Sequence, residues 1–134
     1  MLVLTTTVNQ FHGVLTGGKR KAAKVPYPTA YASAAEAATD LAKHQFNCAQ
    51  RAHANFLENM PNFVLASVVA GLRFPVATAV AGLVWNAGRI VFAKGYAGSK
   101  IEQKGDGRLK GVWYVIPQLA LLGMAATTVY GLVF

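Results

Sequence analysis

Long uncharged runs, separated by basic segments, constrain this 134-residue chain more than any other feature of its sequence. Residues 111–134 carry no charged side chain, and a helix of that length spans the ~30 Å hydrocarbon core of a bilayer. Residues 74–88 and 59–72 are also free of charge. Hydrophobic residues make up 54% of the chain and charged residues 13%, against about 25% charged in a typical soluble domain. These proportions leave two classes open, a very apolar soluble bundle and a small membrane protein.

The net charge of +8 is concentrated in two segments of the chain. Ten of the thirteen lysines and arginines lie within residues 17–45 and 94–110, and the other three are Arg51, Arg73 and Arg89. Basic segments that alternate with uncharged runs are typical of membrane proteins, whose cytosolic loops are rich in lysine and arginine. A soluble basic protein that binds nucleic acid is the weaker alternative, so we expect a membrane protein without a nucleic-acid partner.

The apolar pattern predicts one all-α domain, residues 1–134, that crosses the membrane as a four-helix bundle. The expected helices lie at about residues 2–18, 46–72, 75–97 and 111–134. The first is short for a full span, because 17 residues rise only ~25 Å. The two basic loops, between the first and second and between the third and fourth helices, lie on one side, which the positive-inside rule identifies as cytosolic.

The first basic loop contains two prolines, Pro26 and Pro28, which disfavour a helix there. We therefore expect an extended connector over residues 25–33. The alanine-rich stretch at residues 33–45 is expected to form a short helical turn that leads into the second long helix.

Polar residues recur at helical spacing inside two of the expected spans. Arg51, Asn55 and Glu58 share one face of the second helix, and Arg89 and Tyr96 share one face of the third. Ionisable groups within a membrane are costly, so they usually face a bundle interior or a polar cavity. Two guanidinium groups suit a ligand that carries carboxylates, and Glu58 suits an ammonium group. The spacing therefore predicts a polar pocket that opens to the cytosol.

A purely structural interpretation of the same residues remains open. Arg51 and Arg89 would extend to lipid phosphates at the membrane surface, and Glu58 would neutralise Arg89.

Other chemistry-bearing residues form no recognisable site. His12, His44 and His53 lack metal-ligand spacing, so we expect no metal. Cys48 is the single cysteine and is expected to be a small packing residue. No phosphate-binding loop or dinucleotide fingerprint occurs.

A longer motif carries a resemblance to a known family. The string FNCAQRAHANFLENMP at residues 46–61 is accompanied by VPYP at 25–28, AGLRFP at 70–75 and GRIVFAKGY at 88–96. These motifs resemble the MAPEG family, the membrane-associated proteins of eicosanoid and glutathione metabolism. The most similar branch is that of the type-three microsomal glutathione transferases.

The resemblance implies a four-helix membrane bundle that assembles as a homotrimer, in the endoplasmic reticulum for most relatives. Glutathione, the co-substrate, would bind between neighbouring subunits near the cytosolic face. Glu58 would hold the γ-glutamyl ammonium and the arginines would hold the carboxylates. By similarity, the glutathione-binding residues are Arg51, Asn55, Glu58, Arg89 and Tyr96, with Arg20 contributed by the neighbouring subunit.

The same resemblance implies that the protein is an enzyme, a glutathione transferase or glutathione-dependent peroxidase. A thiol with an unperturbed pKa of about 8.5 is mostly protonated at neutral pH, and a nearby guanidinium favours the thiolate. The thiolate would attack a lipophilic electrophile or a lipid hydroperoxide. The best match for the activating arginine is Arg108 in the stretch GDGRLKG, with Lys104 and Lys110 as alternatives.

The chain also departs from the family pattern. Phe92 stands where many relatives have a tyrosine, which removes a hydroxyl from the expected site. Asn59 stands where leukotriene synthases have a tyrosine, so leukotriene synthesis is not expected. The alternative function is that of a non-catalytic membrane protein of the same fold that binds lipid or acts as a scaffold.

Overall fold

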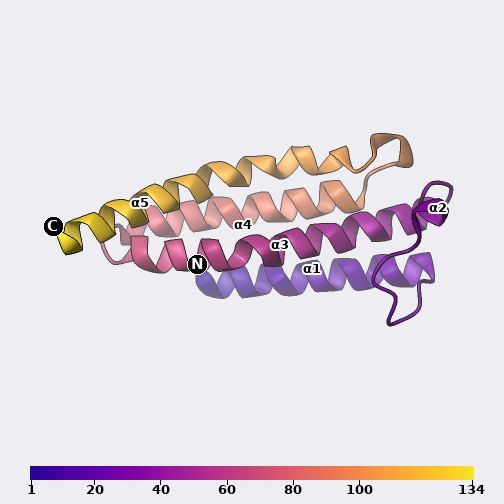
Figure 1. Cartoon of the computed structure of the whole chain (residues 1–134), viewed down its shortest axis with the longest axis horizontal. Helices are drawn as coiled ribbons and strands as arrows, with labels where there is room; N and C mark the ends of the chain where they lie inside the picture. Colours follow the sequence, from indigo (N-terminus) through magenta and orange to yellow (C-terminus); the bar gives the residue numbers. More distant parts are fainter.

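Seven helical segments and no strand form the chain in the computed structural model of residues 1–134 (Figure 1). The all-α class predicted from the sequence is therefore confirmed. Five segments are α-helices and two, η1 and η2, are 3-10 helices. Their bounds are α1 Leu2–Ala23, α2 Ala34–Ala37, α3 Leu41–Gly71, α4 Pro75–Ala97, η1 Ile101–Gln103, η2 Asp106–Tyr114 and α5 Val115–Val133.

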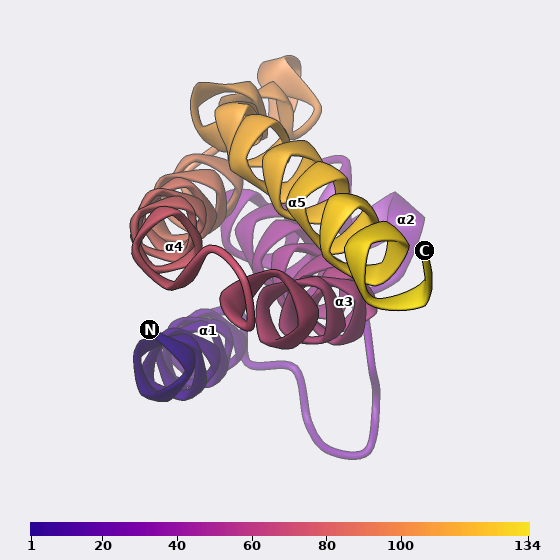
Figure 2. The same ribbon diagram turned by 90° about the vertical axis from the view of Figure 1, so that its left-hand side faces the viewer.

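The four long helices α1, α3, α4 and α5 run side by side along one axis (Figure 1). α3 and α4 contact each other, and each also contacts α1 and α5. α1 and α5 therefore lie on opposite sides of a central α3–α4 pair (Figure 2). The α2 connector and the η1–η2 segment lie at the same end of the molecule (Figure 1), which brings the two basic segments to one end.

Capping residues explain where the helices begin and end. α4 has the bounds expected from the sequence, and Pro75 occupies its first turn, where a missing backbone N–H costs nothing. α3 begins at Leu41, five residues earlier than predicted, because the Asp40 side chain accepts hydrogen bonds from the backbone N–H groups of Ala42 and Lys43. α1 continues five residues past its predicted end, to Ala23.

The start of the last helix was predicted wrongly. Residues 106–114 form η2, and the regular α-helix begins only at Val115. The uncharged run that begins at Gly111 identifies an apolar segment. It does not indicate where within that segment the 3-10 helix ends and the α-helix begins.

The connector between α1 and α3 has the expected form. No helix occurs over residues 25–33, and the predicted short helical turn is α2. Ser33 and Glu36 form a capping box at the start of α2. The Glu36 carboxylate also accepts a hydrogen bond from Lys43, which ties the connector to α3.

Close backbone contact joins α4 to η2. A Cβ atom built on Gly95 would overlap the carbonyl oxygen of Gly107, and one on Gly111 would overlap the backbone of Phe92. Only residues without a Cβ atom permit this approach, so the glycines let η2 lie directly on α4. This packing determines where the side chains of η2 point.

Aromatic side chains fill the core between the long helices. Trp85 of α4 stacks on Phe63 of α3 with ring centroids 3.9 Å apart. The indole Nε1 of Trp85 donates a hydrogen bond to Gln118 Oε1 of α5 at 3.0 Å, which satisfies its one polar atom. Phe56 lies 5.6 Å from Trp85, nearer the basic end of α3. These contacts fix α3, α4 and α5 relative to one another.

Two segments are long and apolar enough to cross a membrane, Pro75–Ala97 and Asp106–Val133. α1 and α3 do not meet the same measure of length and hydropathy. The large side chains of α5 are mostly exposed, among them Ile116, Leu119 and Leu132. An apolar exposed helix of this kind is typical of a lipid-facing segment. The crossing of the membrane by all four long helices stays a prediction.

Gly95→Ala is expected to lower the melting temperature of the detergent-solubilised protein. Overpacking costs about 1–3 kcal/mol, and we expect the upper part of this range because the added Cβ atom meets the backbone of Gly107. Alanine gains only ~1 kcal/mol over glycine within a helix. Thermal unfolding followed by circular dichroism measures the change. Gly123→Ala is the matched control, because a Cβ atom there meets nothing within 4 Å. Equal melting temperatures for the Gly95→Ala variant and the parent would contradict the close packing of η2.

The capping carboxylate gives a second prediction. Hydrogen bonds from Lys43 and Ser33 lower the pKa of Glu36 from 4.5 to about 2. Because the folded pKa is depressed, the stabilisation of the connector is complete above pH 4.5 and is lost as pH falls through about 2. An NMR titration of the Glu36 carboxyl carbon should show this low midpoint. Lys43→Met should move the midpoint toward 4.5, whereas Lys19→Met should not.

Candidate functional site

A cavity of about 370 Å³ opens between α3, α4 and η2 at the basic half of the molecule. Four of the seven residues predicted for the site line it together. Its lining consists of Arg51, Asn55, Phe92, Tyr96, Arg108 and Tyr114. Three of the residues on the predicted helical faces, Arg51, Asn55 and Tyr96, thus meet in one polar space with Arg108, which the family resemblance had indicated.

Arg51 and Glu58 form an ion pair on the outer face of α3. Arg51 Nη1 donates to Glu58 Oε1 at 2.7 Å, and Nη2 donates to Oε2 at 3.3 Å. Each side chain is about half exposed, at 50% and 52%. The two residues lie two helical turns apart and share two hydrogen bonds. This bidentate contact fixes the orientation of the Arg51 guanidinium at the edge of the cavity. Glu58 therefore neutralises Arg51. The structural interpretation, in which Glu58 neutralises Arg89, is wrong.

Arg89 lies beneath the cavity and does not line it. The residue is completely buried, and its Nη1 donates to Asn55 Oδ1 at 2.9 Å. Aromatic rings enclose the guanidinium, the nearest with its centroid 4.3 Å from Cζ. These rings belong to Phe56, Trp85, Phe92 and Tyr114. Arg89 therefore does not extend to the membrane surface, and it acts on the cavity through the orientation of Asn55.

The guanidinium of Arg89 is also incompletely paired. Its Nε and Nη2 atoms are buried and have no hydrogen-bond partner, although each can donate. Contacts with the negative faces of the aromatic rings compensate part of this cost. Asn55 is then the one side chain that accepts a hydrogen bond from Arg89, so we expect the two residues to be energetically coupled.

Among the three basic residues considered for thiol activation, Arg108 is the one that lines the cavity. Its Nη1 lies 3.5 Å from Asp106 Oδ1, and its Cζ lies 5.4 Å from the ring centroid of Tyr96. Lys104 lies in a separate pocket beside His44, and Lys110 is exposed. The 3-10 geometry of η2 thus points Arg108, and neither lysine, into the space above α4.

Arg20 lies apart from this cavity. Its side chain is buried at the end of α1, where Nη1 donates to the Thr29 carbonyl oxygen at 2.6 Å. The guanidinium stacks over Tyr27 and Phe46, 4.3 and 4.6 Å from their centroids. Within one chain, Arg20 therefore holds the connector over residues 25–33 rather than joining the other site residues.

Tyr114 is the cavity residue that the sequence analysis missed. It ends η2, and its ring is the nearest to the Arg89 guanidinium. Helical periodicity could not reveal it, since the residue belongs to a 3-10 helix and to a different segment from Arg89. The paired glycines at positions 88 and 111 were the available signal, because a Cβ atom on Gly88 would overlap Tyr114.

The contact between Arg89 and Asn55 predicts a non-additive effect on stability. Asn55→Ala should lower the free energy of unfolding by about 1.5–3 kcal/mol, because it leaves a buried charge without its polar partner. In an Arg89→Met background the same change should cost less than about 0.5 kcal/mol. Reversible unfolding in detergent micelles measures both values.

Asn59→Ala is the control for this cycle. Asn59 donates to the backbone oxygen of Asn55 at 2.8 Å and makes no hydrogen bond with Arg89. Asn59→Ala should lower the free energy of unfolding by the same amount in the parent protein and in the Arg89→Met variant. Equal costs of Asn55→Ala in the two backgrounds would contradict the coupling.

Comparison with models of protein families matches the MAPEG family over residues 1–130. This family includes membrane glutathione transferases and related enzymes. Together with the two candidate spans, the match makes this a membrane protein. The family predicted from the motif at residues 46–61 is therefore confirmed, and the chain belongs to the MAPEG family.

Proposed function

We propose that this protein is an integral-membrane glutathione transferase that also reduces lipid hydroperoxides with glutathione. The observation that carries the proposal is the meeting of Arg51, Asn55, Tyr96 and Arg108 in one cavity of a MAPEG-family chain. Two guanidinium groups, those of Arg51 and Arg108, line the cavity, and the Glu58 carboxylate lies beside it in an ion pair with Arg51. This is a charge pattern for a ligand with several carboxylates and one ammonium.

Glutathione matches this pattern, since it carries two carboxylates, one ammonium and one thiol. Arg51 and Glu58 are already fixed against each other at the rim, so a ligand carboxylate and ammonium can bind the two ends of the pair. Asn55 is oriented by Arg89 from below. Tyr96 supplies a hydroxyl from α4. The peptide is thus held with little reorganisation of the side chains, which favours affinity.

Arg108 is the group that we propose activates the thiol. A guanidinium close to a sulfur stabilises the thiolate over the thiol and so lowers the thiol pKa. The thiolate is the nucleophile that attacks a lipophilic electrophile. With a hydroperoxide it attacks an oxygen and breaks the O–O bond, which gives the alcohol and glutathione sulfenic acid, and a second glutathione converts the sulfenic acid to the disulfide and water. Asp106, 3.5 Å from Arg108, holds the guanidinium without burying it. No group of three or more His, Cys, Asp or Glu side chains is placed to hold a metal.

The same proposal includes the membrane arrangement of the chain. All four long helices would cross the bilayer, with the basic end of the molecule in the cytosol, in the endoplasmic reticulum membrane. The chain would assemble as a homotrimer in which Arg20 reaches the site of the neighbouring subunit. Motifs over residues 25–28, 46–61 and 88–96 support a place in the type-three microsomal branch.

One observation favours a second candidate, a non-catalytic lipid-binding or scaffold protein of this family. Phe92 forms part of the cavity wall, where many relatives place a tyrosine. The wall therefore lacks one hydroxyl near the expected position of the sulfur. This candidate requires lipid binding and predicts no thiolate from bound glutathione.

The decisive measurement is the ultraviolet thiolate signal of glutathione bound to the purified protein at neutral pH. Arg108→Gln should reduce this signal about tenfold or more, since loss of a neighbouring positive charge raises an acid's pKa by about 1–3 units. The pH profile of conjugation should move to higher pH in parallel. Lys110→Gln, which removes an exposed charge outside the cavity, should leave both unchanged.

Arg51→Ala separates binding from activation in the same assay. It should raise KM for glutathione while the thiolate fraction of the bound ligand stays near that of the parent. Phe92→Tyr should increase conjugation or hydroperoxide reduction by restoring the hydroxyl. Failure of the parent protein to bind glutathione would overturn the proposal, and binding without a thiolate would favour the non-catalytic candidate.

A further inference from the structure

One polar side chain in the wall of the proposed glutathione cavity takes no part in binding or activating glutathione. Tyr114, the last residue of η2, lines this cavity although the residue is only 7% exposed. Its hydroxyl makes no hydrogen bond within the chain, and it is not among the fully enclosed polar atoms that lack a partner. Buried tyrosine hydroxyls are usually paired. The free hydroxyl of Tyr114 therefore reaches the cavity, where it can donate a proton.

Arg108 and Tyr114 lie at different depths of this cavity. Gly107, directly before Arg108, meets the backbone of Gly95. Tyr114 instead lies against Gly88, seven residues earlier in α4, which corresponds to a rise of about 10 Å. Because α4 ends at the basic end of the molecule (Figure 1), Arg108 lies toward that end and Tyr114 lies deeper along the helices. In the proposed membrane arrangement, Tyr114 is on the bilayer side of the cavity, from which a lipid hydroperoxide enters.

The ring of Tyr114 also packs against the wall position at which the chain departs from its family. Phe92 contacts the rings of both Tyr96 and Tyr114 edge to face, with centroids 5.8 and 5.7 Å away. The wall lacks a hydroxyl at position 92, and η2 supplies one beside it. Tyr114 comes from a different segment of the chain, so it is a separate source of a hydroxyl at this depth.

The buried guanidinium of Arg89 lies beside the same ring. Its Cζ is 4.3 Å from the centroid of Tyr114, and its Nε and Nη2 are buried donors without a partner. A positive charge and hydrogen bonds to the oxygen both stabilise a phenolate. Arg89 would therefore stabilise Tyr114 after the hydroxyl has given up its proton. The incomplete pairing of Arg89 in the folded chain leaves its donors available for this state.

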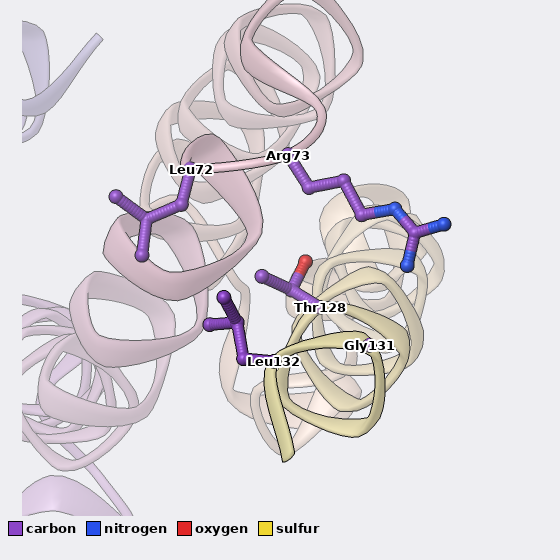
Figure 3. Close-up of a pocket in the computed structure, with 5 residues that line it drawn as sticks. All are labelled: Leu72, Arg73, Thr128, Gly131 and Leu132. Carbon is purple, nitrogen blue, oxygen red and sulfur yellow. The ribbon is translucent and has the colours of Figure 1, made fainter. Parts of the chain in front are cut away.

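The cavity at the opposite end of the molecule offers no comparable group. It has a volume of about 330 Å³, and Figure 3 shows the one hydroxyl of its lining, that of Thr128, together with the side chain of Arg73. Thr128 Oγ1 already donates to the Met124 carbonyl oxygen at 2.8 Å. An arginine keeps its proton at any pH at which the protein is folded. A free phenol therefore distinguishes the proposed glutathione cavity from this one.

We propose that Tyr114 is the catalytic proton donor in hydroperoxide reduction, an inference that rests on the proposed function. The glutathione thiolate attacks the terminal oxygen of the hydroperoxide, so that a sulfur–oxygen bond forms and the O–O bond breaks. The electron pair of the broken bond goes to the alkoxide, which takes the proton of Tyr114 and leaves as the alcohol. The sulfur is oxidised to the sulfenic acid. The phenolate then regains a proton from water, which balances the proton that the thiol released when it ionised.

This role makes the hydroxyl necessary for one class of substrate only. An alkoxide is a strong base and a poor leaving group, so its departure is faster when a proton is transferred to it. A chloride ion leaves an aryl chloride without a proton. Conjugation of an aryl chloride therefore uses the same thiolate but does not need Tyr114.

Steady-state kinetics of the purified Tyr114→Phe variant test the inference. The substitution keeps the ring against Phe92 and Arg89 and removes only the hydroxyl. kcat for reduction of cumene hydroperoxide should fall about a hundredfold or more, the usual effect of losing a general acid. KM for glutathione, the thiolate signal and the conjugation of chlorodinitrobenzene should stay near those of the parent. The melting temperature should also be unchanged, since the hydroxyl has no partner within the chain.

Tyr130→Phe is the matched control. It removes an exposed tyrosine hydroxyl at the opposite end of α5, next to Gly131 of the cavity in Figure 3. Both activities should equal those of the parent protein.

Three results would overturn the inference. An unchanged kcat for cumene hydroperoxide in Tyr114→Phe would show that the hydroxyl donates no proton. Equal losses of both activities, with or without a lower melting temperature, would show that the hydroxyl only supports the shape of the cavity. A parent protein that conjugates chlorodinitrobenzene but reduces no hydroperoxide would lack the reaction that needs the proton. The first two results leave the proposed function intact, whereas a parent protein that forms no glutathione thiolate would contradict both.

Discussion

The buried guanidinium of Arg89 is the interaction on which the candidate site depends. It sits where α3, α4 and η2 meet, and it touches all three through Asn55, Phe92 and Tyr114. A charge in this position is expensive, so the surrounding rings and the Asn55 amide must be held close to it. The same requirement keeps Asn55 oriented at the floor of the cavity. Stability and site geometry are therefore linked through one side chain.

The second constraint is the absence of Cβ atoms where η2 lies on α4. Gly95 and Gly107 meet backbone to backbone, and Gly111 lies against Phe92 in the same way. A 3-10 helix is less favourable than an α-helix over nine residues. Here it allows the segment to follow the surface of α4 and to point Arg108 over the cavity. Loss of regular helical geometry thus serves the placement of a functional side chain.

Sequence patterns predicted which residues share one face of a regular α-helix. They did not predict side-chain positions in the 3-10 segment η2. Arg51, Asn55 and Glu58 were found because a spacing of three or four residues identifies a helical face. The same spacing could not show that Arg89 lies below the cavity, since periodicity gives direction but not depth. The sequence also left open whether Arg108, Lys104 or Lys110 activates the thiol, because these residues lie outside the regular α-helices. Turns have no regular period, and no sequence pattern marks residues 106–114 as a 3-10 helix with a period of three.

The helix boundaries illustrate the same limit. Pro75 gave the start of α4 because proline restricts the backbone locally. The start of α3 depended on the Asp40 cap, which lies outside the apolar run used to predict the helix. The onset of α5 at Val115 depended on contacts with α4, which are not local in the sequence. Local chemistry is therefore readable from the sequence, whereas boundaries set by tertiary contact are not.

The Arg51–Glu58 pair raises the question of what covers the outer face of α3. Both side chains are half exposed, and Leu57 beside them is exposed as well. A bidentate ion pair facing hydrocarbon would lose its hydration without compensation. A neighbouring subunit that presents polar groups to this face would avoid that cost and would enclose the open side of the cavity. The exposed pair is therefore the feature of the single chain that best supports the proposed trimer, with a glutathione site completed between subunits.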